Sequence, residues 1–347
     1  MTSLVTKDSW LISQGQDGDG IPEVIGGFTV PNPLHIFTDI SNYERCGVFP
    51  MVYSCNGPVV VEKCIQRRLS TLAQGLDLVS HDLNVIVYAG VDGMIGHLNL
   101  FIAGVLHRDP SVGNLLIDPN PGVRTDEQIF NNNCLRLDKF EFLKTIGHLK
   151  RCYGYLIDSD LAIRWKDQRE AARHRSGTLP FMSHRLLESW DSRPLHTAID
   201  DLESFVWIVL WSALKTIKSP TFRELDWLTR ISDDDIQVVA AFKMTIMILI
   251  SKPRTELSPE LKPFHPLFKR WFSIALDAQD KLDELIASAT IKAVPTIDLD
   301  TLLCDKAKSV HFIQEVEELC FGYYQQYLKG GTEFLQGRGM YGDLEKA

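Results

Sequence analysis

Two acidic clusters in the sequence carry side chains that could hold metal ions and handle a proton. The stretch HRDPSVGN places Asp109 and Asn114 five residues apart, directly before the apolar run LLI. A second stretch, YLIDSD, places Asp158 directly after an apolar run. Carboxylate and amide oxygens suit Mg²⁺, which prefers hard oxygen ligands and substrate phosphates. If Asn114 and Asp158 hold metal ions, Asp109 is free to accept a proton from an attacking hydroxyl or to orient it, which is the division of labour that phosphoryl transfer requires.

Short apolar segments must place these side chains at the edge of a core. The pair VL before His107 and the run LLI after Asn114 are typical of short buried strands around a polar turn. The upstream stretch SHDLNVIVYAGVDGMIGHLNLFIAG has apolar residues at helical spacing, and Ser80 is its expected N-cap. This predicted helix delivers the chain into the turn that carries Asp109.

The rest of the chain divides into a β-rich front and a helical back. Residues 1–60 are rich in Gly, Pro and short apolar runs, which is typical of strands and turns. Farther on, DDLESFVWIVLWSALK is apolar nearly all round and predicts a core helix. The run Val238–Ile250, interrupted by Lys243, predicts another buried helix and is too short to span a bilayer. We therefore expect an α+β fold in three parts: residues 1–80, residues 81–330, and a poorly ordered tail at 331–347.

The composition narrows the class of protein. The 347 residues carry a net charge of −9, and 45% of them are hydrophobic. This acidic balance disfavours nucleic-acid binding, because such binding needs a basic surface to meet phosphates. The seven cysteines are scattered without a C-x-x-C pair, which is typical of reduced thiols in a cytoplasmic or nuclear protein. The stretch MTSLVTKDSW lacks the apolar core of a secretory signal, so we expect no membrane partner. From the acidic net charge we expect no nucleic-acid partner.

Four motifs in a fixed order carry a family resemblance. HRDPSVGN resembles the H-R-D-x-x-x-x-N catalytic loop of protein kinases, and YLIDSD stands where kinases carry their magnesium-binding D-F-G. GTLPFMSHR resembles the end of a kinase activation segment, and DDLESFVW resembles the helix that anchors the catalytic loop from beneath. With LVTKDSW near the N-terminus, these motifs are similar to the fungal-type protein kinase-like family, from roughly Thr6 to Leu214.

This resemblance implies both a fold and an activity. The fold would be bilobal, with a reduced β-rich N-lobe (residues 1–80) that lacks the Gly-rich-loop strands and a large, mainly helical C-lobe (residues 81–330). The activity would be transfer of the γ-phosphate of ATP to a Ser or Thr hydroxyl of a protein, with ATP and Mg²⁺ as cofactors.

The resemblance also implies a role for each catalytic-loop residue. Asp109 would be the catalytic base or would orient the attacking hydroxyl. Arg108 would pair with a phosphate on the activation segment through a bidentate bond. Ser111 stands where serine/threonine kinases often carry Lys, as it does in the fungal family. Thr178 is expected to hydrogen-bond toward Asp109, and His107 to pack and hydrogen-bond in the core.

Other residues would form the cofactor side of the site and its support. Asn114 and Asp158 would hold the metal ions and, with them, the nucleotide. Lys7, in LVTKDSW, would pair with the α- and β-phosphates. Beneath the loop, Asp201 would hold the catalytic-loop backbone, whereas its neighbour Asp200 is expected to be exposed.

Departures from the family pattern leave more than one function open. Only six residues precede Lys7, so the Gly-rich loop that should lie before it has no room. The interval LISQGQDGDG contains no Glu to pair with Lys7. Arg185 replaces the Glu of the activation-segment motif, so that its ion pair is missing or inverted. The chain is therefore an active kinase, or else a pseudokinase-like scaffold or N-terminally truncated fragment that acts by protein interaction. The sequence names neither substrate nor partner, and we expect a monomer.

Overall fold

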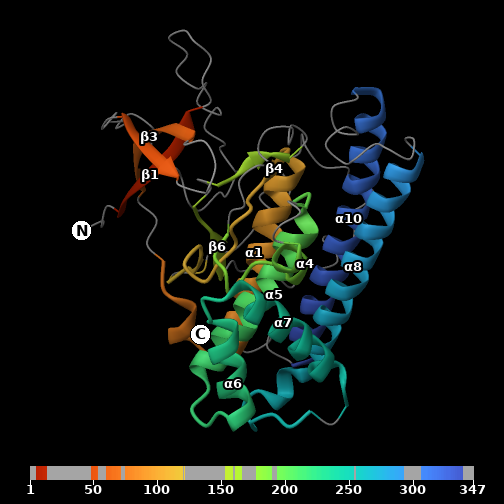
Figure 1. The fold of residues 1–347 in the computed structure, drawn as a ribbon. Helices are drawn as coiled ribbons and strands as arrows, with labels where there is room; N and C mark the ends of the chain where they lie inside the picture. The colour runs from red at the N-terminus through yellow and green to blue at the C-terminus, as the bar shows by residue number, and fades with distance from the viewer. Residues whose placement is uncertain are drawn as a thin grey trace. The chain divides into compact units, whose positions relative to one another are not determined.

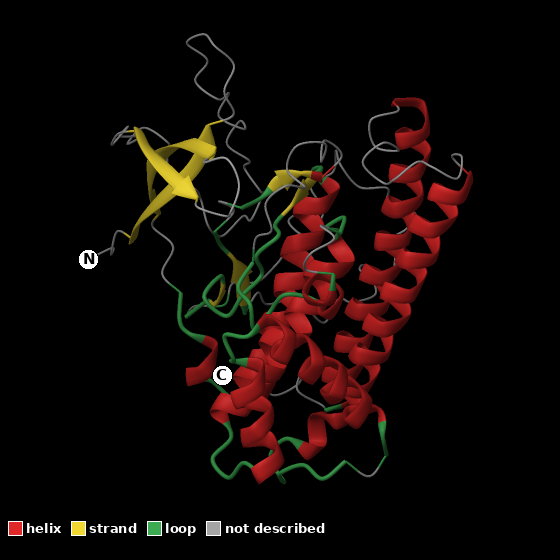
Figure 2. Cartoon of the chain, in the orientation of Figure 1, coloured by secondary structure: helices red, strands yellow, loops and turns green. Residues whose placement is uncertain are grey.

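The computed structural model describes residues 5–13, 48–53, 60–71, 75–119, 121, 153–158, 161–165, 177–189, 194–253, 255–292 and 306–338. The chain forms two compact units, the first made mainly of residues 1–75 and the second mainly of residues 76–347 (Figure 1). Figure 2 shows that helices predominate and that the strands are few, which agrees with the predicted α+β class.

The described part of the first unit is a three-stranded antiparallel sheet. β1 (Val5–Ser13), β2 (Val48–Tyr53) and β3 (Val60–Thr71) lie in the order β1-β3-β2. Their β-branched and aromatic residues fit a pleated surface, which favours strands over helices. Lys7 lies on the edge strand β1, opposite Leu69 of β3.

The second unit is built around two long buried helices, α1 (Leu83–Ile102) and α5 (Ala198–Thr216). The two helices pack closely, since a Cβ added to Gly90 on α1 would lie 2.5 Å from Cγ2 of Val209 on α5. The predicted N-cap of α1, Ser80, is wrong. The helix is capped by Asp82, whose carboxylate accepts the N–H of Asn84 at 2.8 Å, and Ser80 instead ends the short 3-10 helix η2 (Leu78–Ser80). Asp is favoured at this position because its carboxylate satisfies one of the unpaired N–H groups of the first turn.

By length and composition alone, α1 is long and apolar enough to cross a membrane. In the fold, 78% of its most apolar 18-residue window is buried within the protein. A helix that is apolar on every side passes this test equally well when it lies in the middle of a core. The packing of α1 against α5 therefore accounts for its apolar composition.

The second core helix, α5, follows the prediction from its apolar sequence. Its first turn is closed by Asp200, which accepts the backbone N–H of Thr197 at 2.8 Å. Phe205 and Trp207 in its middle are both 0% exposed. The buried middle of α5 thus fixes the position of the polar residues at the N-terminal end of the helix.

Three shorter helices pack near α5: α4 (His184–Glu188), α6 (Phe222–Ile231) and α7 (Ile236–Ser251). The predicted burial of α7 holds for one face only. That face contains Lys243, which is 0% exposed and therefore does not interrupt the buried surface as the sequence suggests. The other buried residues of α7 are Val239, Ala240, Ile246, Met247 and Ile250.

Two long helices, α8 (His265–Lys292) and α10 (Lys306–Gly337), run side by side in antiparallel directions (Figure 1). Trp271 of α8 donates its indole N–H to the carbonyl of Tyr327 of α10 at 3.0 Å. The poorly ordered tail predicted from residue 331 begins too early, because α10 continues to Gly337 and Leu335 is 0% exposed. Gly331 lies so close to α1 that an added Cβ would be 2.5 Å from Cγ2 of Val91.

Two short antiparallel ladders follow α1 in the chain, and the second of them packs against the first half of that helix. β4 (Val105–Leu106) pairs with β7 (Ile163–Arg164), and β5 (Leu115–Ile117) pairs with β6 (Gly154–Leu156). The N–H of Asp118 donates to the carbonyl of Tyr153 at 2.8 Å and extends the second ladder by one bond. The carboxylate of Asp92 on α1 accepts the N–H groups of Tyr153 and Gly154 at 2.6 and 3.1 Å. A buried side chain of α1 thus fixes the start of β6.

The packing of β6 on α1 predicts opposite effects for two Gly→Ala substitutions. A Cβ on Gly154 would lie 2.6 Å from Cα of Ala89, so Gly154→Ala should lower the free energy of unfolding by about 1–3 kcal/mol. Gly96 of α1 has nothing within 4 Å of an added Cβ, and Gly96→Ala should raise it by roughly 0.5–1 kcal/mol. Urea unfolding of both variants measures the difference. Equal effects of the two substitutions would contradict the close approach of β6 to α1.

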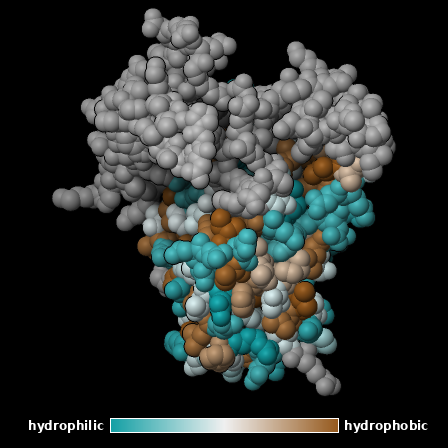
Figure 3. Space-filling model, viewed as in Figure 1, coloured by the Kyte–Doolittle hydropathy of each residue, from teal (hydrophilic) through white to brown (hydrophobic). Residues whose placement is uncertain are grey.

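On the face shown in Figure 3, hydrophilic and hydrophobic residues are interspersed over the described surface. The large hydrophobic side chains that the structure exposes include Phe222, at 87%, and Leu225, at 48%, both on α6. Single exposed apolar side chains are ordinary on a protein surface and need no partner to explain them.

Candidate functional site

The predicted catalytic loop lies between β4 and β5. The N–H of Asp109 donates to Nδ1 of His107 at 3.3 Å, so Nε2 of the same ring is the nitrogen that donates to the carbonyl of Ile157 at 3.0 Å. His107 is 1% exposed, which confirms its predicted place in the core. Arg108 has a φ of 69°, in the left-handed region that non-glycine residues rarely adopt. This conformation turns the chain sharply between His107 and Asp109.

Asp109 is held from two sides. Its Oδ1 accepts both the N–H and the hydroxyl of Thr178, at 2.8 and 2.9 Å, so the predicted hydrogen bond from Thr178 is present. Its Oδ2 accepts Nδ2 of Asn114 at 3.1 Å, and the same nitrogen donates to the Asp109 carbonyl at 2.8 Å. Burial raises the pKa of Asp109, and the hydrogen bonds from Thr178 and Asn114 oppose that rise. A raised pKa makes the carboxylate a better proton acceptor than an exposed Asp.

The second ladder brings Asn114 and Asp158 to adjacent positions of the backbone. Leu115 pairs with Leu156, and the N–H of Ile157 donates to the carbonyl of Asn114 at 2.8 Å. Asp158 follows directly, with a φ of 68° that turns the chain out of the strand. Asn114 uses its amide nitrogen on Asp109, which leaves its Oδ1 as the oxygen that could face an ion.

These two residues have the donor chemistry that Mg²⁺ needs. Mg²⁺ is commonly held by one or two protein oxygen ligands together with water and substrate phosphates. An amide oxygen from Asn114 and a carboxylate from Asp158 fit that requirement. Among the residues that the structure describes, no group of three or more His, Cys, Asp or Glu is placed to hold a metal ion.

Two other predicted site residues have structural positions but untested roles. Ser111 is 4% exposed, and its carbonyl accepts the N–H groups of Asn114 and Leu115, both at 3.0 Å, so it forms the turn that ends the loop. Lys7 lies in the first unit on β1, and its side chain is outside the description. The predicted contact of Lys7 with phosphates stays a prediction.

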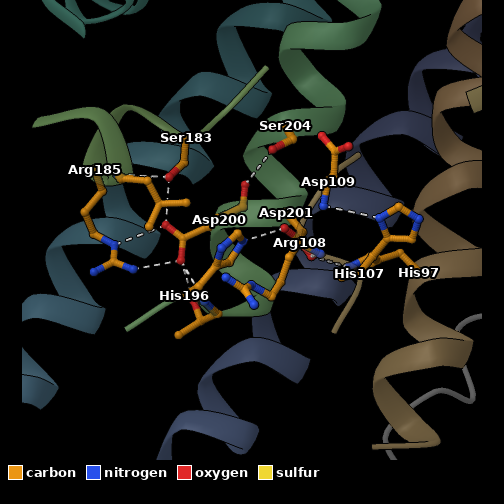
Figure 4. Close-up of polar contacts among 12 residues, drawn as sticks. His97, His107, Arg108, Asp109, Ser183, Arg185, His196, Asp200, Asp201 and Ser204 are labelled. Atoms are coloured by element: carbon orange, nitrogen blue, oxygen red, sulfur yellow. Dashed lines mark hydrogen bonds and ion pairs between the residues drawn. The ribbon is translucent and has the colours of Figure 1, made fainter. Parts of the chain in front are cut away.

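Asp201, at the start of α5, holds the catalytic loop from beneath, as the sequence predicts. Its Oδ2 accepts the N–H of Arg108 at 2.9 Å and lies 2.7 Å from Nε2 of His97, while its Oδ1 lies 2.7 Å from Nε2 of His196 (Figure 4). Burial alone would raise its pKa, but His196 and His97 hold the pKa of Asp201 well below its usual range. The loop is therefore tied to an ionised, fully buried carboxylate.

Sequence reasoning missed both histidines on Asp201. His97 lies within the apolar run of α1, and its Nδ1 is 2.5 Å from the hydroxyl of Tyr324 on α10. His196 precedes Asp201 by five residues. A lone His in an apolar helix was a signal for a buried polar partner, but its partner lies 104 residues farther along the chain.

Arg108 is 7% exposed. Burial lowers the pKa of its guanidinium, and the charge of Asp201 opposes that effect. Its predicted phosphate partner would lie on the activation segment, and residues 166–176 directly before Gly177 lie outside the described residues. The predicted phosphate contact of Arg108 therefore stays a prediction.

Asp200 is buried, contrary to the prediction that it is exposed. It is 1% exposed and forms an ion pair with Arg185, which is 5% exposed, at 2.7 Å from Nη2 to Oδ2 (Figure 4). Nε of Arg185 donates to Oδ1 of the same carboxylate at 3.2 Å, and the Ser183 hydroxyl donates there at 2.7 Å. The Arg that replaces Glu in the activation-segment motif thus does have a buried ion pair, with its polarity inverted. The physical reason is that an Asp on α5 supplies the opposite charge.

Comparison with known families agrees with this geometry. Residues 52–213 match the family model described as fungal protein kinase, and this segment includes the catalytic loop, Asp158, Thr178 and most of α5. Lys7 lies outside the matched residues. A search of curated proteins found no significant match. The resemblance of this sequence to the fungal-type protein kinase-like family is confirmed by the match over residues 52–213.

Proposed function

We propose that the chain is a protein kinase-type phosphotransferase that moves the γ-phosphate of ATP to a Ser or Thr hydroxyl. The observation that best supports this function is that Asp109 is a partly buried carboxylate which accepts hydrogen bonds from Thr178 and Asn114. It stands on a loop tied to Asp201, within the segment that matches the kinase family.

The hydrogen bonds indicate which oxygen of Asp109 would meet the substrate. A carboxylate oxygen accepts about two hydrogen bonds, and Oδ1 already accepts two from Thr178. Oδ2 accepts one from Asn114 and can accept another. Oδ2 would therefore receive the hydrogen bond of the attacking hydroxyl and, as transfer proceeds, its proton.

The other residues would bind and orient the reactants. Asn114 Oδ1 and the Asp158 carboxylate would hold Mg²⁺, which when bound neutralises charge on the phosphates. Asp201 would keep the backbone of Arg108 and Asp109 in place by accepting the N–H of Arg108. The Thr178 bonds would keep the carboxylate from rotating away from the hydroxyl.

Thermal unfolding with and without Mg-ATP tests the nucleotide site. A ligand at about 100 times its dissociation constant stabilises a protein by roughly 2.7 kcal/mol, so the midpoint should rise by several degrees. The rise should require magnesium and should vanish in Asp158→Asn. Asp226→Asn, the same change at an exposed site on α6, is the matched control and should keep it. The absence of a shift in the unaltered protein would count against this function.

A second candidate function is a catalytically inactive scaffold. The sequence favours it at one point, since the interval between Trp10 and Ile21 carries no Glu to pair with Lys7. Such a scaffold would bind a partner protein and transfer no phosphate, with or without Mg-ATP.

For either function we propose a monomer in the cytoplasm or nucleus, on the basis of the scattered cysteines and the acidic net charge.

A further inference from the structure

The backbone on either side of Ser183 is held by two buried charged side chains. Nζ of Lys243 on α7 donates to the carbonyl of Met182. Oε1 of Glu203 on α5 accepts the N–H of His184 at 2.8 Å. Lys243 and Glu203 are both 0% exposed. Two successive peptide groups at the end of the activation segment are therefore fixed by opposite charges from two different helices.

Lys243 and Glu203 are surrounded by the core. The Lys243 ammonium lies 4.6 Å from the centroid of the Trp207 ring, whose indole N–H donates to Glu203 at 2.7 Å. Gln279 of α8 also donates to Glu203. Burial lowers the pKa of Lys243 to about 7, against the opposing effect of Glu203, and burial raises the pKa of Glu203.

Stability alone does not explain such a pair. Desolvating two charges costs about as much as their attraction returns, and well-packed apolar side chains of similar volume often serve stability as well or better. An apolar side chain cannot, however, fix the position of a carbonyl and an N–H. The specific effect of this pair is therefore on the backbone of Met182 and His184.

A short and tightly bonded turn connects Met182 to the candidate site. The N–H groups of Phe181 and Met182 both donate to the carbonyl of Thr178, at 2.8 and 3.2 Å. Gly177, with a φ of 137°, has so little room that an added Cβ would lie 3.0 Å from Cγ of Met182. Thr178 then donates twice to Asp109. A displacement of Met182 is thus passed to Asp109 through one turn of backbone.

We propose that Lys243 and Glu203 are positioning residues that fix the backbone from Thr178 to His184 and so keep Thr178 hydrogen-bonded to Asp109. The effect on catalysis rests on the proposed phosphotransfer. The effect on the segment rests on the hydrogen bonds alone, and the two are measured separately.

Amide hydrogen exchange in the full chain tests the structural part. In Lys243→Met, the amides of Thr178, Phe181 and Met182 should exchange about tenfold faster, because the segment opens locally more often. The amides of α8 and α10 should accelerate by a smaller factor, set by the loss of overall stability that the unpaired buried Glu203 causes.

A double variant separates positioning from stability. Lys243→Met with Glu203→Gln removes both charges of the pair, and the Gln Oε1 can still accept the N–H of His184. It should recover stability relative to Lys243→Met alone, while the amides from Thr178 to Met182 still exchange about tenfold faster than in the unaltered protein.

The matched control is Glu224→Gln. Glu224 on α6 is 1% exposed and accepts the N–H of Ser258 at 2.9 Å, so it is, like Glu203, a buried carboxylate that accepts a backbone N–H. It should leave exchange in the segment unchanged. If the segment amides in the double variant exchange at the usual rates, or accelerate no more than those of α8 and α10, the pair is merely structural and the proposal is overturned.

Steady-state kinetics of the double variant test the catalytic part. A positioning role lowers kcat by about tenfold and leaves the KM for ATP unchanged, because Thr178 acts on Asp109 rather than on the nucleotide. An unchanged kcat overturns the catalytic part. If the unaltered protein transfers no phosphate, the proposed function fails, whereas the exchange measurements still decide whether Lys243 and Glu203 fix the segment.

Discussion

Replacing Asp109 with Asn is expected to lower the rate of phosphotransfer by about 100- to 10,000-fold, the range of a single general acid or base. The amide keeps the size of the carboxylate, and its oxygen can still accept both bonds from Thr178. Its NH₂ group would then take the place of Oδ2, where the substrate hydroxyl needs an acceptor. The same NH₂ would face the donor Nδ2 of Asn114, so a small loss of stability is expected.

The rate is measured as γ-phosphate transfer to a protein substrate or to the chain itself, with thermal unfolding as the check on folding. Asp226→Asn makes the same chemical change on the surface of α6 and should not alter the rate. If Asp109→Asn stays folded and keeps its activity, Asp109 is neither the base nor the orienting group.

Replacing Asp200 with Asn is expected to have the largest effect on stability, a loss of about 3–5 kcal/mol in the free energy of unfolding. Arg185 would keep its charge in the core without the carboxylate that now accepts its Nε and Nη2. Asp200 also accepts the hydroxyl of Ser183 and the N–H of Thr197, so activation segment and α5 would loosen together. Urea unfolding measures the loss.

A double variant tests whether the unpaired charge of Arg185, rather than the change in side-chain packing, causes the loss of stability. Asp200→Asn with Arg185→Met removes both charges of this ion pair, and most of the stability should return. Asp226→Asn should cost almost nothing, because exposed ion pairs contribute little. A double variant as unstable as Asp200→Asn would show that the uncompensated charge of Arg185 is not the cause.

The effect of Asp200→Asn should also depend on pH in a defined direction. Burial would raise the pKa of Asp200, but Arg185 and His196 hold it below its usual value. Its contribution to stability is therefore fully present above the pKa of an unfolded Asp, about 3.9, and is lost as the pH falls through the lower folded value. The difference in stability between the unaltered protein and the variant should narrow on acidification below about pH 4.

The sequence predicted the parts of the site that local patterns determine. The five-residue spacing from Asp109 to Asn114, between two short apolar runs, folded as a turn between strands. The apolar surface of α5 identified it as a core helix, because a helix without a polar face must be buried on every side. Apolar residues at helical spacing identified α1 as a helix. The hydrogen bonds from Thr178 to Asp109 and from Arg108 to Asp201 agree with what the family resemblance implies for Thr178 and Asp201.

The buried charges could not be predicted in the same way. Charged side chains are usually exposed, and a buried one depends on a partner that the local sequence does not reveal. Lys243 donates to the Met182 carbonyl 61 residues away, and Arg185 pairs with Asp200, 15 residues farther along the chain. The sequence therefore treated Lys243 as an interruption and Asp200 as a surface residue.

The end of α10 was missed for a related reason. The pair Gly330–Gly331 weakens helix propensity and favours a disordered tail when it is read locally. In the fold, α10 closely approaches α1 and Trp271 at Gly331, where an added Cβ would lie 2.5 Å from Cγ2 of Val91 and 3.0 Å from the Trp271 ring. A larger residue would have prevented the packing that keeps this turn helical.

The hydrogen bond between the Asp118 N–H and the Tyr153 carbonyl has a consequence for how the candidate site is aligned. It adds one bond to the ladder of β5 and β6, and Asp92 fixes Tyr153 and Gly154 to α1. A slip of one residue between two paired strands would turn every side chain of the slipped strand to the opposite face. These bonds at the end of the ladder therefore hold a single register, in which the carbonyl of Asn114 accepts the N–H of Ile157 and Asp158 follows directly.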